Sequence, residues 1–101
     1  MITIEEAKAN VYKIVCNLWK SELSSDDELI ILDSETIEKE NYWVFFYTSK
    51  LWFETNELRY AVAGNAPIIV NKKRGEMKLT GTAYPIEKYM AEYEEEIEKA
   101  K

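Results

Sequence analysis

Histidine is absent from this 101-residue sequence, and cysteine, proline and glycine are scarce. Histidine is the commonest general base and the commonest metal ligand, so its absence removes the usual basis for acid–base or metal-assisted catalysis. The three glycines are not spaced as a phosphate-binding loop. Cys16 lies beside the apolar face of an expected helix with no histidine to activate it, which indicates a structural thiol. The sequence therefore predicts a protein that is not an enzyme and needs no cofactor and no metal.

Long apolar runs and an N-terminal basic segment are also missing. A membrane-spanning helix needs about 20 consecutive apolar residues, and no segment approaches that length. Residues 1–6 have neither the basic nor the apolar stretch of a signal peptide. A lone cysteine cannot form an internal disulfide, so we expect a reducing, cytoplasmic location and no membrane association.

Positively charged residues are fewer than negatively charged ones: the sequence has 13 Lys and Arg residues and 19 Asp and Glu residues, for a net charge of −6. This balance disfavours nucleic acid, whose phosphates need a basic patch. It is compatible with a basic protein partner, because complementary charge speeds encounter. Solubility alone is the simpler explanation of the acidity.

Two helices are expected, one at each end of the chain. Thr3 and Glu6 form a capping box before a helix over about 4–20. Pro85 opens the last helix, where its missing amide costs nothing. Apolar side chains at helical spacing mark the buried faces: Ala7, Val11, Ile14, Val15, Leu18 and Trp19 in the first helix, and Ile86, Met90, Tyr93 and Ile97 in the last. The glutamates over 92–98 face water.

Four strands are expected between these helices. The first covers 29–32 and continues through 36–37 with an irregularity at 33–34. The second covers 42–48, with 51–53 as a candidate extension and 54–63 as a loop, for which a helical turn within it is the alternative. Strands over 68–70 and 76–80 form a hairpin. Short connections favour antiparallel pairing. The predicted fold is a single α+β domain over 1–101, with the N-terminal helix packed on a four-stranded antiparallel sheet and a C-terminal helix.

The strand over 42–48 is apolar on both sides. Trp43, Phe45 and Tyr47 alternate with residues that face the other way, and both sets are largely apolar. The first helix covers one side. Cover for the second side is expected from the last helix or the 50–63 segment, with another molecule, including a homodimer partner, as the alternative.

All glycines and prolines lie within 64–85. Gly64 and Gly81 are expected to have positive φ or very close backbone neighbours, and Gly75 suits the positive φ of a hairpin turn. Pro67 and Pro85 fix the chain just after the turns at Gly64 and Gly81. A structural role for this motif is favoured over ligand binding.

A wider pattern over about 29–95 combines Trp43–Tyr47, Glu54-Thr55, the Gly64-Asn65-Ala66-Pro67 run with Ile68–Val70, Gly75-Glu76, Gly81-Thr82-Ala83 and Ile86–Tyr89. This pattern resembles the YrhB-type, immunity protein 35 family. The resemblance implies a small bacterial α+β protein that neutralises a cognate protein toxin. It also leaves open a chaperone-like role with broad clients, and it implies no catalytic residues.

Candidate partner contacts follow from acidic and aromatic side chains. Aromatic side chains anchor interfaces, and charges at the rim tune the association rate. We therefore consider the acidic segments around 26–28, 35–40 and 54–57 together with the aromatic residues near them in the sequence. The candidate contacts are Asp26, Asp27, Glu28, Trp52, Glu54 and Tyr60. The alternative for 26–28 is a loop that caps a helix end or a strand start.

Overall fold

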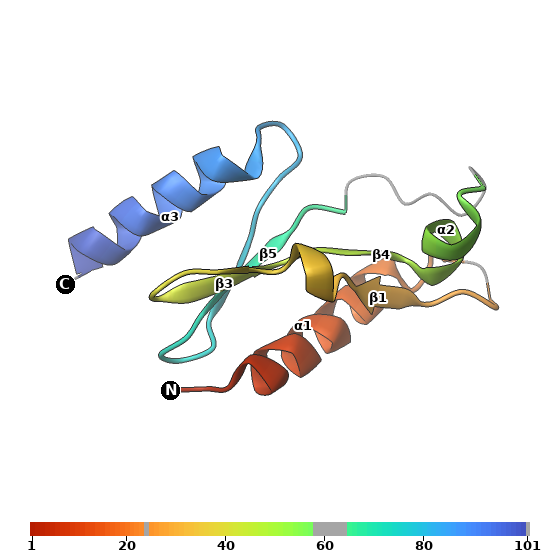
Figure 1. The fold of residues 1–101 in the computed structure, drawn as a ribbon, viewed down its shortest axis with the longest axis horizontal. Helices are drawn as coiled ribbons and strands as arrows, with labels where there is room; N and C mark the ends of the chain where they lie inside the picture. The colour runs from red at the N-terminus through yellow and green to blue at the C-terminus, as the bar shows by residue number, and fades with distance from the viewer. Residues whose placement is uncertain (24, 58–64, 101) are drawn as a thin grey trace.

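Antiparallel strands lie between two helices in the computed structural model, which describes residues 1–23, 25–57 and 65–100. Helices α1 and α3 cover opposite sides of the strands (Figure 1). The elements follow the order α1 (Ile4–Trp19), β1 (Leu29–Ile31), η1 (Asp33–Glu35), β2 (Ile37–Glu38), β3 (Tyr42–Phe45), β4 (Tyr47–Ser49), α2 (Lys50–Thr55), β5 (Ile68–Asn71), β6 (Met77–Leu79) and α3 (Ile86–Ala100). The predicted α+β class with antiparallel pairing is confirmed.

Helix α1 begins with the predicted capping box. The Thr3 hydroxyl accepts a hydrogen bond from the Glu6 amide at 3.1 Å, and the Thr3 amide donates to the Glu6 carboxylate at 3.2 Å. Ala7, Val11 and Val15 are fully buried against the strands. The expectation is wrong for Ile14 and Leu18, which are exposed. The buried stripe continues from Val15 to Trp19, which packs on the same cluster, and the side chains of Ile14 and Leu18 lie at the margin of that stripe.

The first two predicted strands are each divided between two sheets. One sheet has the order β2-β3-β5-β6, and β1 pairs with β4 in a second, two-stranded sheet. Ile30 pairs with Thr48, and Ile37 pairs with Val44. From one pair to the other, the first predicted strand advances by seven residues, whereas the second covers only four. The three residues of η1 take up the difference, at the predicted irregularity.

The central strand β3 is buried on both sides, as its alternation predicts. Trp43 and Phe45 pack with α1, whereas Tyr42 and Val44 pack with Met90 and Tyr93 of α3. Two hydrogen bonds also attach α3 to the sheet: the Tyr42 hydroxyl donates to Glu94 at 2.5 Å, and the Asn71 side-chain amide donates to the Tyr93 hydroxyl at 3.0 Å. The second side of the sheet is therefore covered from within the chain.

Residues 51–53 do not extend the second strand, because they lie in helix α2. Ser49 ends β4 and caps this helix, with its hydroxyl accepting from the Trp52 amide at 3.1 Å. At the other end Asn56 adopts a left-handed φ of 58°, and its amide donates to the Trp52 carbonyl. Of the loop expected over 54–63, Glu54 and Thr55 complete α2, and 58–63 lie outside the described residues.

The hairpin of β5 and β6 matches its prediction, and Gly75 has the expected positive φ of 77°. Gly81 does not have positive φ. Its close neighbour is a side chain rather than backbone, because a Cβ there would lie 2.7 Å from the Tyr89 hydroxyl oxygen. Gly64 lies outside the described residues. Pro85 directly precedes α3, and its carbonyl accepts from the Lys88 amide at 3.1 Å.

Candidate functional site

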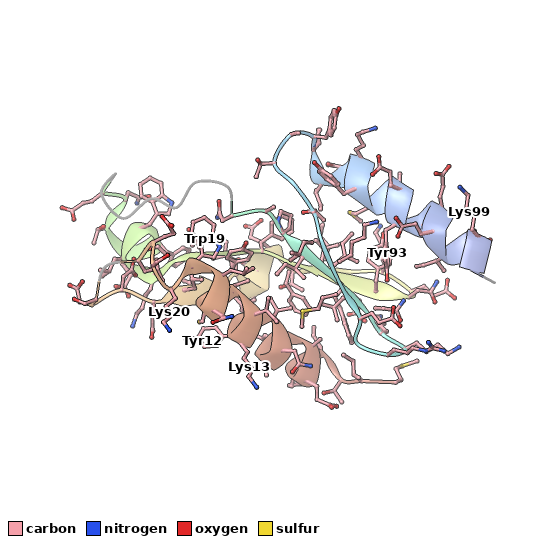
Figure 2. All side chains as sticks on the ribbon, turned by 180° about the vertical axis from the view of Figure 1, so that it is seen from behind. Tyr12, Lys13, Trp19, Lys20, Tyr93 and Lys99 are labelled. Carbon is pink, nitrogen blue, oxygen red and sulfur yellow. The ribbon has the colours of Figure 1, made fainter. Side chains whose placement is uncertain are left out.

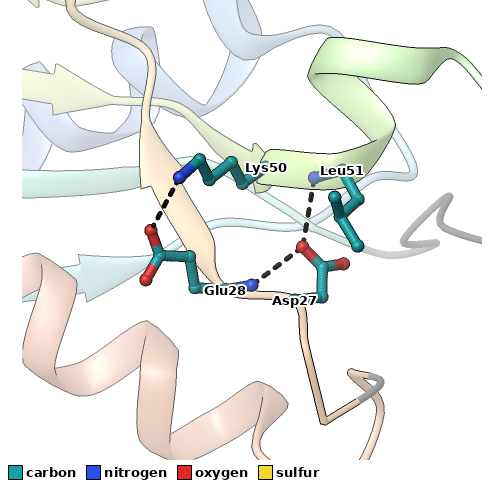
Figure 3. A network of polar contacts seen from close by, with 4 residues as sticks. All are labelled: Asp27, Glu28, Lys50 and Leu51. Atoms are coloured by element: carbon teal, nitrogen blue, oxygen red, sulfur yellow. Dashed lines mark hydrogen bonds and ion pairs between the residues drawn. The ribbon is translucent and has the colours of Figure 1, made fainter.

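The acidic loop at 26–28 meets the start of α2. Asp27 accepts hydrogen bonds through one carboxylate oxygen from the Glu28 amide at 2.8 Å and the Leu51 amide at 3.1 Å (Figure 3). Its other oxygen accepts a short hydrogen bond from the Ser49 hydroxyl. Asp27 and Ser49 together satisfy amides at the helix start that would otherwise lack partners.

These contacts set the ionisation of Asp27. Partial burial acts to raise the pKa of the carboxyl group, but the hydrogen bonds from Ser49, Leu51 and Glu28 outweigh it and hold the pKa below its usual value of 3.8. The ionised carboxylate also suits the positive end of a helix dipole. For Asp27, this geometry favours the helix-capping alternative over a direct partner contact.

The neighbours of Asp27 remain accessible. Asp26 and Glu28 are exposed. The Lys50 amide donates to the Glu28 carbonyl at 2.8 Å, and the Lys50 ammonium lies 3.6 Å from the Glu28 carboxylate. Surface ion pairs of this kind contribute little stability, so the Glu28 carboxylate can exchange Lys50 for a partner's cation.

Helix α2 places aromatic and acidic side chains beside this loop. Trp52 is half-buried, Glu54 is exposed, and Phe53 is 60% exposed. Five of the six predicted contacts, Asp26, Asp27, Glu28, Trp52 and Glu54, come from two segments that are hydrogen-bonded to each other, the loop over 26–28 and helix α2. We call these two segments together the α2 face. Tyr60 lies outside the described residues. Phe53 is not among the predicted contacts, because 51–53 were expected as a candidate strand extension. The signal that indicates a helix is Ser49, a good N-cap residue three positions before Trp52.

A second accessible feature lies where α1 ends. A hollow of about 450 Å³ is lined by Leu18, Trp19, Glu22, Tyr47, Ala66, Leu79 and Thr80. Figure 2 shows Trp19 at the C-terminal end of α1. Its indole N–H donates to the Tyr47 hydroxyl at 3.4 Å. Burial raises the pKa of Tyr47, although this hydrogen bond acts to lower it, so the phenol stays neutral at ordinary pH.

The described glycine- and proline-rich motif residues make contacts within the fold. The Asn65 side-chain amide donates to the Tyr47 carbonyl at 2.9 Å, and the Pro67 carbonyl accepts from the Thr80 hydroxyl at 2.6 Å. Trp43 is only 5% exposed, with the Lys72 ammonium 5.2 Å from its ring centre. These contacts join β4, β5 and β6.

The part of the chain that the structure describes has neither a metal-binding cluster nor a membrane-spanning helix. Within residues 1–23, 25–57 and 65–100, no three or more acidic or cysteine side chains gather as a metal site. No helix among those residues has the length and apolar character needed to cross a membrane. Cys16 is half-buried.

Comparison with known proteins agrees with the resemblance in the motif region. The family model for immunity protein 35 matches residues 5–95. A curated relative, "Uncharacterized protein YrhB" of Escherichia coli (strain K12), is 41% identical over 58 residues. The aligned segment spans 57% of this chain and 60% of that relative. No solved structure matches.

Proposed function

Because this chain belongs to the immunity protein 35 family, we propose that it binds a cognate protein toxin and neutralises it by stoichiometric occlusion. Occlusion needs a surface that binds tightly, not a centre that turns substrate over. The sequence has no histidine and carries a net charge of −6, which fits a binding role against a basic partner in the cytoplasm.

The observation that carries this proposal is the arrangement of the α2 face. The exposed acidic loop over 26–28 is hydrogen-bonded to the start of α2, and that helix carries half-buried Trp52, exposed Phe53 and exposed Glu54. Aromatic anchors with a charged rim are the typical composition of an interface hot spot. Asp27 supports this face indirectly, because it caps the helix that presents the aromatic side chains.

The proposal implies that a toxin is encoded beside this gene. The test uses that toxin, with binding measured by calorimetry and protection measured by toxin activity. We expect saturation at one protein per toxin. Protection at far below one equivalent would contradict occlusion and indicate turnover.

Two variant pairs test the surface. Phe53→Ala and Glu54→Lys should each weaken toxin binding by about tenfold or more, because they remove an anchor and reverse a rim charge. Tyr84→Ala and Glu95→Lys make the same chemical changes at exposed positions near or on α3, and should leave binding within about twofold of the parent. Equal effects in both pairs would place the contact surface elsewhere.

A chaperone-like protein with broad clients is the second candidate. The exposed apolar side chains of Ile14, Leu18 and Leu79 favour it, because unfolded clients are held through such groups. Weak binding to many unfolded proteins, without selective binding to the adjacent toxin, would support this role against the first.

A further inference from the structure

Strand β6 forms one edge of the four-stranded sheet. The Asn71 amide donates to the Glu76 carbonyl at 2.8 Å, and the Thr80 amide donates to the Pro67 carbonyl at 3.3 Å. Hydrogen bonding alternates along an antiparallel pair, so the main chain of Lys78 also faces β5. The amides and carbonyls of Met77 and Leu79 therefore face outward, and no main-chain partner for them is found within the described residues.

An apolar hollow adjoins this edge on the α1 side. Leu79 is 59% exposed and Leu18 is 54% exposed, and both line the hollow of about 450 Å³. Leu18 lies seven residues after the fully buried Val11, so both point in nearly the same direction from α1. A side chain oriented toward the core but left exposed marks a place where the apolar packing is incomplete.

A polar hollow adjoins the same edge on the α3 side. It has a volume of about 510 Å³ and is lined by Glu76, Met77, Lys78, Leu79, Tyr93 and Glu96. The Lys78 ammonium is paired with Glu96. The other carboxylate, Glu76, lies 3.8 Å from the Arg74 guanidinium in an exposed ion pair of the kind that contributes little stability. Glu22 adds a carboxylate to the lining of the other hollow.

We propose that β6 is the docking edge for an extended segment of the toxin, which adds to the sheet as a fifth strand. This inference rests on the proposed function. The outward groups of Met77 and Leu79 supply the main-chain hydrogen bonds, and the hollows on either side select alternate side chains. An apolar side chain fits beside Leu18 and Leu79, and a basic one fits beside Glu76 and Glu96.

A second copy of this chain is a poorer occupant. In an antiparallel pair of β6 strands, one from each copy, only one register forms hydrogen bonds with the outward main-chain groups of both Met77 and Leu79 in each copy. That register places Lys78 directly opposite the Lys78 of the copy. Like charges at directly opposed positions destabilise a strand pair, so the edge favours a strand of different sequence.

Amide hydrogen exchange of the parent with and without the adjacent toxin tests this proposal without a substitution. The Met77 and Leu79 amides should exchange fast in the free protein and slow by about tenfold or more in the complex. The Lys78 amide, already bonded to β5, should change little. Unchanged exchange at Met77 and Leu79 in a saturated complex would overturn the strand addition and leave the proposed function standing.

Leu79→Pro is the matching variant, because it deletes an outward amide and no internal ladder bond. It should melt near the parent temperature yet bind toxin about tenfold more weakly, whereas Leu79→Ala, which keeps the amide, should lose less. Equal binding by Leu79→Pro and the parent would overturn the inference. If the parent dimerises in the absence of toxin and Leu79→Pro does not, the edge would be assigned to a second copy instead. Failure of the parent to bind toxin would reject the proposed function as well.

Discussion

Asp27 connects two segments that are far apart in the sequence. Its carboxylate accepts from Ser49 and from the Leu51 amide, 24 residues away. This one side chain fixes the loop before β1 to the start of α2, and so holds the α2 face in place. Its role is that of a scaffold for the neighbouring side chains.

Replacing Asp27 by Asn should destabilise the fold by about 1 kcal/mol at neutral pH, because the charge-assisted hydrogen bonds of the carboxylate and its interaction with the helix dipole are lost. The pKa of Asp27 is lowered in the folded state, so its contribution is complete above the unfolded pKa of about 3.9 and is lost as pH falls through the folded pKa. Denaturant melts at pH 7 and near pH 2 measure this. The gap between parent and variant should shrink at the lower pH, whereas Glu95→Gln, a matched change on α3, should show little gap at either.

Gly81 is required by Tyr89 rather than by its own backbone conformation. Gly81→Ala places a Cβ 2.7 Å from the Tyr89 hydroxyl oxygen, which should cost about 1–2 kcal/mol through overpacking. Tyr89→Phe removes that oxygen and should recover most of the loss in the double variant. A double-mutant cycle from unfolding free energies measures the coupling. Strictly additive effects would contradict the contact.

Strand β3, like β5, contributes side chains to both apolar clusters of the fold. It pairs with both β2 and β5, and its alternate side chains enter two separate apolar clusters, one under α1 and one under α3. Loss of a large side chain from it therefore leaves a cavity that neither neighbouring strand can close.

Trp43→Ala should cost about 3–5 kcal/mol of unfolding free energy, because the ring is only 5% exposed in the cluster under α1. Tyr84→Ala removes an exposed aromatic ring and should change stability by less than about 0.5 kcal/mol. Denaturant melts of both variants measure the difference. A loss below about 1 kcal/mol for Trp43→Ala would contradict its burial in the core.

For the whole molecule, the net charge of −6 is the property that acts on a partner over the longest distance. The association rate with a basic toxin should fall by about tenfold between low and high salt, while the dissociation rate changes less. Stopped-flow mixing across a salt series measures both. A rate that is flat with salt would exclude electrostatic steering by the acidic surface.

The sequence by itself determined the features that depend on neighbouring residues. The Thr3–Glu6 capping box, the positive φ of Gly75, the alternation of β3 and the apolar stripe of α3 are all local patterns. Each was predictable because the interaction that fixes it lies within a few residues or follows from the strand or helix period.

Tertiary structure decided the rest, because the deciding contacts come from far along the chain or from the limits of the sheet. Residues 51–53 are apolar enough for a strand, yet Asp27, which is 24 residues away, accepts from the Leu51 amide and adds to the local Ser49 cap to start a helix there. Leu18 has the spacing of a core residue, yet it is 54% exposed while Trp19 packs against the core. The outward amides of β6 follow from its place at the sheet edge, which local periodicity does not encode.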